Sequence, residues 1–203
     1  MFLIPFKHLY TSIMDNSSSP ILHILLFGGT GRTGRHVINL ALDSGYAVTV
    51  VARNPSAMQL THALLNVVKG DILQPDTFAE YMVGKDAVIS CTGTDSGKPT
   101  KIYSQGVQNI LKAMQAAGVK RIMCISADAV VINPKLPFIY KLVAKYVLWK
   151  ILKNPFTDLL LMEKILEHST ADWTVVRPPQ LTNKPLTGKY RVAINSYLKG
   201  ACG

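Results

Sequence analysis

Three glycines are spaced so that they could hold the phosphates of a nucleotide. Gly28, Gly31 and Gly34 follow an apolar run at residues 21–27 and precede a stretch with helical spacing at residues 35–42. This order is typical of a phosphate site, although an ordinary strand–helix turn is the simpler alternative. Gly28 would allow a tight turn, Gly31 a close approach of the backbone to a pyrophosphate, and Gly34 close packing of the helix on the sheet. The helix N-terminus would then offer free N–H groups and a partial positive charge to the anion.

The residues after the next strand indicate which dinucleotide would bind. An NAD site usually has an Asp or Glu there that holds the ribose hydroxyls. Here Arg53 follows the strand at residues 47–52, and no acidic residue occurs before Asp71. Arg53 has a planar guanidinium that suits a 2′-phosphate, and Arg32 in the glycine loop could assist. The sequence therefore favours NADP(H) over NAD(H), the alternative being that Arg53 only faces solvent.

Polar and small residues follow three further strands. Asp71 could bond the adenine amine or cap the turn that follows it. Thr92 and Gly93 would let the backbone lie against the dinucleotide, unless they form a plain turn. Ser126 is the candidate catalytic residue, because a hydroxyl at that strand end can bond the nicotinamide carboxamide or a substrate oxygen. A serine at a strand end is also common for structural reasons.

Two more features bear on catalysis. The consecutive Pro178 and Pro179 cannot extend a strand, so the chain must leave the sheet there, over the nicotinamide end. Tyr146 and Lys150 form a Tyr-x-x-x-Lys pair, which in a short-chain dehydrogenase supplies a tyrosine acid. The pair lies in a segment rich in Tyr and Lys, where chance matches are easy. The helix expected at residues 156–168 is the better register for a catalytic helix, and it contains no tyrosine.

Alternating strands and helices must position these residues. The expected strands lie at residues 21–27, 47–52, 67–69, 86–91, 121–125 and 172–176, and the expected helices at residues 35–42, 101–117 and 156–168. Strands that alternate with helices imply right-handed crossovers and a parallel sheet. We therefore expect an α/β fold: one Rossmann-like, doubly wound parallel sheet of strand order 3-2-1-4-5-6, with helices on both faces. The ligand crevice should lie at the carboxyl ends of the first and fourth strands.

Composition restricts the class of protein. The chain has 203 residues, 48% apolar and 17% charged, which fits one domain with a sizeable core. The net charge of +10 suits an anionic ligand, and the basic residues are too scattered for a nucleic-acid site. Histidines and cysteines show no metal-ligand spacing, and no apolar run is long enough for a membrane span. We read Cys91 and Cys124 as buried, reduced residues, which favours a cytoplasmic setting.

Two segments lie apart from this scheme. Residues 1–20 resemble neither a secretory nor a mitochondrial leader, and we expect them to be a disordered leader or a mis-assigned start, with the dinucleotide-binding domain at residues 21–203. Residues 133–154 resemble a basic amphipathic helix suited to a membrane surface or a partner groove. Their lysines leave no clean apolar stripe, so a substrate-side flap or a subunit contact is the preferred interpretation.

Successive segments of the chain resemble a known family. GGTGRTGRHV, VARNPS, KGDILQPDTF, DAVISCTGT, AAGVKRIMCISA and DWTVVRPPQLTNKPLTGKYRV follow the order seen in the atypical short-chain dehydrogenases with an NAD(P)H-binding domain. The chain is most similar to their biliverdin-IX-beta reductase / flavin reductase group. That resemblance implies hydride transfer from NADPH to a flavin, bilin or quinone-like acceptor by a monomer.

The resemblance also assigns roles to individual residues. It places Thr30, Gly31, Arg32 and Thr33 on the pyrophosphate, Arg53 on the 2′-phosphate, Asp71 and Ile72 at the adenine, Thr92 and Gly93 beside the ribose, Ser126 beside the nicotinamide, and Pro178 and Pro179 on its far side. Two family histidines are replaced, by Gln180 and Leu159, so their role as proton donors is lost. Flavin reduction suffers least, because the remaining proton can come from water. The family usually continues into a further helix beyond the position of Gly203, so we expect either a truncated chain or an edge covered in another way.

Two alternatives to this reductase remain open. One is a non-catalytic NADP(H)-sensing regulator whose partner surface is the basic, apolar segment at residues 138–153. The other is a dehydrogenase or epimerase that uses Tyr146 and Lys150 on an alcohol or a sugar.

Overall fold

Six parallel strands form one sheet in the order β3-β2-β1-β4-β5-β6. The computed structural model describes residues 21–94, 97–130, 149–179, 181–182, 188 and 190–194, and it describes residues 149–152 by their backbone only. The strands are β1 (His23–Phe27), β2 (Ala47–Ala52), β3 (Leu65–Lys69), β4 (Ala87–Ser90), β5 (Arg121–Ile125) and β6 (Asp172–Val176). The predicted fold class and strand order are confirmed.

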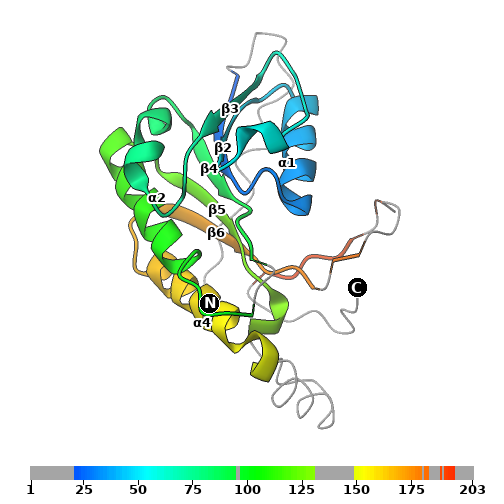
Figure 1. Cartoon of the computed structure of the whole chain (residues 1–203), viewed down its shortest axis with the longest axis vertical. Coiled ribbons are helices and arrows are strands. Elements are labelled where there is room, and N and C mark those ends of the chain that lie inside the picture. The colour runs from blue at the N-terminus through cyan, green and yellow to red at the C-terminus, as the bar shows by residue number, and fades with distance from the viewer. Residues whose placement is uncertain are drawn as a thin grey trace.

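Helices cover both faces of this sheet (Figure 1). Helix α1 (Arg32–Asp43) lies on one face, while α2 (Ser104–Ala117) and α4 (Trp149–Glu167) contact each other on the opposite face. Short 3-10 turns complete the connections: η2 (Pro55–Ala57), η3 (Pro75–Thr77), η4 (Ala79–Met82) and η5 (Asp128–Val130). No α-helix occurs between β2 and β3, where only η2 crosses from one strand to the next.

The alternation of side chains along each buried strand divides the core into two layers. In β1, Ile24 and Leu26 pack with Ile38 of α1, whereas Leu25 and Phe27 belong to the cluster around α2 and α4. Successive side chains of a strand point to opposite faces, so a strand covered on both sides must be apolar throughout. This explains why β1 reads as a continuous apolar run.

The start of α4 differs from the prediction. The sequence predicts a helix at residues 156–168, but α4 already begins at Trp149 and contains Pro155. A proline removes one helical hydrogen bond and usually marks an end. The helix continues because the turn after Pro155 is anchored: Phe156 is buried in the α2–α4 core, and the Thr157 hydroxyl donates to the carbonyl of Lys153 at 2.7 Å.

Several predictions concern parts of the chain that are not described. Residues 1–20 and residues 131–148 lie outside the described ranges, and so do Tyr146 and Gln180. Lys150 belongs to α4, but its side chain is not described. The expected leader, the basic segment and the Tyr-x-x-x-Lys pair therefore stay predictions.

Candidate functional site

The carboxyl ends of the central strands are joined beyond the strands themselves. The N–H of Cys91 donates to the carbonyl of Phe27 at 2.9 Å, and the N–H of Ser126 donates to the carbonyl of Val176 at 2.8 Å. Residues that follow β1, β4, β5 and β6 therefore share one edge of the sheet. The sequence predicted that the glycine loop, Thr92 and Ser126 would meet at this edge, and the topology brings their strands together there.

Gly28 is required because another part of the backbone touches it. Its φ is +76°, and a Cβ at this position would lie 2.5 Å from the carbonyl carbon and oxygen of Cys91. No side chain fits there, and the positive φ is itself unfavourable for other residues. Gly28 therefore joins the loop after β1 directly to the residues after β4, which is a closer constraint than the tight turn expected from sequence.

The other glycines of the loop have different roles. A Cβ on Gly34 would lie 2.2 Å from the carbonyl oxygen of Gly28, so α1 begins in direct contact with the loop. A Cβ on Gly31 would meet only that same oxygen, at 3.3 Å. Gly31 thus leaves open backbone where a ligand can approach. The sequence interpretation missed Gly29, whose missing side chain admits Val50 of β2 at 2.6 Å from the Cβ position.

The N-terminus of α1 is prepared for an anion. Gly31 is its N-cap and makes no side-chain cap, and the first turn contains no acidic residue. The first N–H groups of a helix have no partner within the helix, so they favour a negatively charged group in front of them. Arg32 is exposed in this first turn, and Arg53 is exposed directly after β2. The region therefore combines a helix N-terminus with cations and suits phosphates.

The loop after β3 is held in place by its own polar groups. The Asp71 carboxylate accepts the N–H of Leu73 at 3.0 Å, so the alternative in which Asp71 caps the turn is observed. The Ile72 side chain is buried, and its carbonyl accepts a hydrogen bond from Asn109 of α2 at 2.9 Å. Asn109 is a supporting residue that the sequence interpretation missed. The adenine contacts of Asp71 and Ile72 stay predictions.

The turn after β4 is open toward solvent at Gly93. Nothing lies within 4 Å of a Cβ built there, and the neighbouring N–H of Thr94 donates to the Tyr103 hydroxyl at 3.2 Å. The Thr92 hydroxyl accepts from the hydroxyl of Ser90 at 3.3 Å. Polar contacts thus hold the turn on both sides, while Gly93 leaves room for a ligand. The contacts of Thr92 and Gly93 with a ribose stay predictions.

Ser126 carries the least satisfied polar group of the site. Its side chain is 6% exposed, and its hydroxyl oxygen is buried with no hydrogen-bond partner within the described part of the chain. Most buried hydroxyls have a partner, so an exception calls for an explanation. A ligand group at this edge of the sheet, beside the glycine loop, would supply the missing partner.

The two prolines after β6 are tied to the residues that follow Ser126. The N–H of Asp128 donates to the carbonyl of Pro178 at 3.0 Å, and Pro179 is exposed. Arg177 forms a two-pronged ion pair with Glu163 of α4, with Nε donating at 2.9 Å. The chain therefore leaves the sheet along η5, as the prolines predicted. Leu159 is buried in the core and supports packing.

The cysteines near this edge are inert thiols. Burial raises the pKa of the Cys91 thiol to about 11, and burial and the nearby Cys91 raise the pKa of the Cys124 thiol to about 12. Both cysteines are free; Cys124 is buried as predicted, whereas Cys91 is only partly buried. Within the described residues, no group of His, Cys, Asp and Glu is arranged to hold a metal ion.

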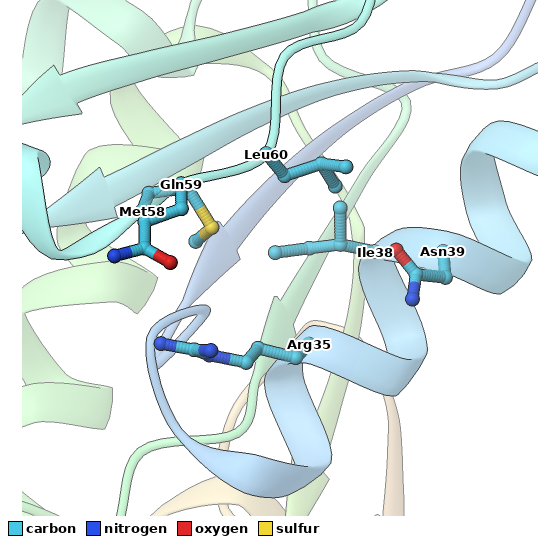
Figure 2. Close-up of a pocket in the computed structure, with 6 residues that line it drawn as sticks. All are labelled: Arg35, Ile38, Asn39, Met58, Gln59 and Leu60. Atoms are coloured by element: carbon cyan, nitrogen blue, oxygen red, sulfur yellow. The ribbon is translucent and has the colours of Figure 1, made fainter.

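Two hollows lie away from Ser126. One, of about 180 Å³, lies beside α1 and is shown in Figure 2. The larger, of about 540 Å³, is lined by the end of α2 and by the residues before β6, at the opposite edge of the sheet from the glycine loop. Over the part of the chain that is described, no helix is both long enough and apolar enough to cross a membrane.

The fold and the site together define a dinucleotide-binding protein of the Rossmann type. The glycine loop, the uncapped α1 and the strand order, in which β1 lies between β2 and β4, are the elements of such a site. The model of the NAD(P)H-binding protein family matches residues 28–200. The chain belongs to this NAD(P)H-binding family.

The chain is similar in sequence to a photosystem II assembly factor. The chain is 27% identical over 177 residues to the photosystem II assembly factor Ycf39 of Synechocystis, a match that covers 85% of this chain and 49% of the relative. The chain thus spans about half the length of that relative.

Solved structures show the same fold. The oxidoreductase ylbE of Lactococcus lactis is similar with a TM-score of 0.67 at 21% identity, over 82% of this chain and 73% of that one. The anaerobillin reductase ChuY of Escherichia coli O157:H7 is similar with a TM-score of 0.63 at 22% identity, over 82% of this chain and 77% of that one.

Proposed function

We propose that this chain is an NADPH-dependent reductase that transfers hydride to a planar acceptor such as a flavin or a bilin. The observation that carries this proposal is the buried hydroxyl of Ser126, which has no hydrogen-bond partner among the described residues and lies at the same sheet edge as the glycine loop. A site that bound phosphates alone would need polar groups only at the start of α1. The Ser126 hydroxyl lies at the end of β5, so it supports binding of a second part of the ligand there, the nicotinamide ring.

Each part of the edge has a task in this reaction. The N–H groups at the start of α1 bind the pyrophosphate, and the exposed Arg53 binds the 2′-phosphate. Ser126 donates its hydroxyl hydrogen to the nicotinamide carboxamide or to an oxygen of the acceptor. Pro178, fixed by the N–H of Asp128, limits how far the ring can tilt. These groups orient the cofactor and the acceptor, so that the hydride-donating carbon of the nicotinamide lies next to the carbon or nitrogen atom that accepts the hydride.

The electron balance needs no protein acid. NADPH supplies a hydride, that is, one proton and two electrons, to a ring nitrogen of the flavin. Water supplies the remaining proton, so that NADPH, oxidised flavin and one proton become NADP⁺ and reduced flavin. Replacement of the family histidines by Gln180 and Leu159 is compatible with such an acceptor. The likeness to ChuY concerns the fold, and it shows that this fold can carry a bilin reductase.

The test is steady-state oxidation of NADPH, followed by its absorbance, with flavin mononucleotide and with a bilin as acceptors. We expect turnover that depends on protein and acceptor, and weaker turnover with NADH. Tight NADPH binding without turnover of either acceptor would contradict the reductase function. We place the enzyme in the cytoplasm because Cys91 and Cys124 are free thiols, and we expect a monomer because the resemblance to the flavin reductase group implies one. Cell fractionation and light scattering test these two points.

A second function rests on a different observation. A relative with 27% identity over most of this chain is named an assembly factor. By that similarity the chain would be an NADP(H)-sensing protein whose partner binding depends on the dinucleotide. A partner that is retained on the immobilised protein in the presence of NADP⁺, but not of NADPH, would support this function, and the absence of turnover would be required by it.

A further inference from the structure

Arg35 joins two segments that are distant along the chain. Its Nε–H donates to the carbonyl of Thr30 at 3.2 Å, and its Nη2–H donates to the carbonyl of Ala57 at 3.3 Å. Thr30 belongs to the glycine loop, and Ala57 ends η2. The planar guanidinium presents several N–H groups in fixed directions, which allows one side chain to bind two carbonyls.

The segment that ends in Ala57 begins with the residue proposed to bind the 2′-phosphate. Arg53 directly follows β2, and the next residues form one compact turn: the N–H of Ala57 donates to the carbonyl of Asn54 at 3.2 Å, and the Ser56 hydroxyl donates to the Asn54 side chain at 2.6 Å. Because Ala57 is hydrogen-bonded to Asn54, a contact that holds Ala57 in place also holds Asn54, the residue next to Arg53. In this crossover no α-helix performs that task.

Packing does not hold Arg35 in place by itself. Its side chain is exposed and borders the hollow beside α1, where Figure 2 shows the guanidinium extending from α1 past Met58 and Gln59. Arg35 lines this hollow of about 180 Å³ together with Ile38 and Leu60. The two hydrogen bonds of the guanidinium are therefore direct links between the glycine loop and η2.

The local charge explains why such a link matters. Arg32 and Arg35 lie in α1 after β1, and Arg53 directly follows the neighbouring strand β2, so three exposed cations follow adjacent strands; no acidic residue lies in the first turn of α1. Like charges in one region repel each other unless an anion lies between them. A turn held by Arg35 through Ala57 would keep Arg53 on the side of the glycine loop, where it could share a phosphate with Arg32.

We propose that Arg35 is a positioning residue for cofactor choice, which keeps Arg53 at the glycine loop and so raises the preference for NADPH over NADH. This inference rests on the proposed NADPH-dependent function and deepens it. It concerns the 2′-phosphate, because the bond from Arg35 to Ala57 reaches the turn that follows Arg53, whereas the proposed pyrophosphate site consists of backbone N–H groups at the start of α1, which is itself fixed by the contact of Gly34 with Gly28.

The test is a double-mutant cycle with the dissociation constants of NADPH and NADH. The proteins are the wild type, R35M, R53M and R35M/R53M, each checked for folding by circular dichroism. We expect R35M to raise the dissociation constant of NADPH by about tenfold, as for the loss of charge-assisted hydrogen bonds, and that of NADH by less than about twofold. In the R53M background, R35M should leave the ratio of the two constants unchanged.

Two further variants make the result decisive. R35K keeps the charge but lacks the planar fork, and we expect it to lose most of the preference. K112M removes an exposed charge on α2, far along the chain from this loop, and should leave the ratio as in the wild type. If R35M does not fold, R35K carries the test.

The possible outcomes distinguish a failure of the positioning role of Arg35 from a failure of the proposed NADPH-dependent function. Equal weakening of NADPH and NADH by R35M would show a purely structural role, and additive effects of R35M and R53M would show a direct contact with the phosphate; either result overturns the inference. A wild-type protein without preference for NADPH would instead contradict the cofactor choice in the proposed function. A wild-type preference that R35M and R35K both retain would overturn the inference alone.

Discussion

Asp158 of α4 caps the N-terminus of α2 at Ser104. The carboxylate is 5% exposed and accepts hydrogen bonds from the Ser104 hydroxyl, from the N–H of Ser104 at 3.4 Å and from the N–H of Tyr103 at 2.9 Å. The residue at the N-cap of α2, Tyr103, makes no side-chain cap of its own. A residue from a neighbouring helix thus supplies the acceptor that a local Ser, Thr, Asp or Asn usually provides.

We expect the substitution Asp158→Ala to lower the free energy of unfolding by about 3 kcal/mol, because buried N–H and O–H donors lose their acceptor. Ser104→Ala removes one donor and leaves the carboxylate bonded to the backbone, so it should lower stability by only about 1 kcal/mol. Urea unfolding measures both. Equal effects of the two substitutions would contradict the capping role of Asp158.

Gly28 and Gly45 form a matched pair, since their φ angles are +76° and +77°. Alanine at Gly45 meets nothing within 4 Å and should lower stability by about 1 kcal/mol, as expected for a left-handed residue. Alanine at Gly28 would in addition clash with the backbone of Cys91, so we expect a further loss of about 2 kcal/mol and much weaker NADPH binding. Thermal unfolding and fluorescence titration with NADPH compare the two variants, and similar losses would refute the close contact.

Ser126→Ala should separate ligand binding from stability. The hydroxyl has no partner among the described residues, so its removal should leave the free energy of unfolding unchanged or raise it by up to about 1 kcal/mol. The kcat/KM of NADPH oxidation should fall by about tenfold, the value of one lost hydrogen bond in the reacting complex. Ser90→Ala is the control, because that buried serine donates to Thr92 and its loss should lower stability. A stability loss in Ser126→Ala with unchanged turnover would contradict the assignment.

The cysteines make stability depend on pH in the alkaline range. Burial raises the thiol pKa from 9.0 to about 11 in Cys91 and to about 12 in Cys124. In this range the folded protein binds more protons than the unfolded chain, so stability is full below pH 9 and decreases as the pH rises toward these values. Urea unfolding between pH 8 and 11 should show a smaller decrease for the Cys91→Ala/Cys124→Ala variant than for the wild type. If the free energy of unfolding decreases equally with pH in the variant and in the wild type, the two thiols do not cause the pH dependence.

The strand order and the edge of the sheet that bears the site were predictable because their signals are local. Each of these signals is contained in a few consecutive residues: the short apolar runs, the glycine spacing, and the pair Pro178–Pro179. The contact between Asp158 and Ser104 joins residues 54 apart, and no local pattern marks it. In the sequence Arg35 has no feature that distinguishes it from other helical arginines, and only the structure shows its hydrogen bond to the carbonyl of Ala57. The predicted start of α4, at residue 156, is wrong, because the helix begins at Trp149 and continues through Pro155.

The bonds that tie β5 to β6 beyond the strands limit how the acceptor side can be redesigned. The N–H of Ser126 donates to the carbonyl of Val176, and the N–H of Asp128 in η5 donates to the carbonyl of Pro178. If the loop after β6 is exchanged and either carbonyl moves, the Ser126 hydroxyl should move as well. Transplanting an acceptor pocket from another enzyme should therefore begin after Pro179, so that the cofactor side keeps its geometry.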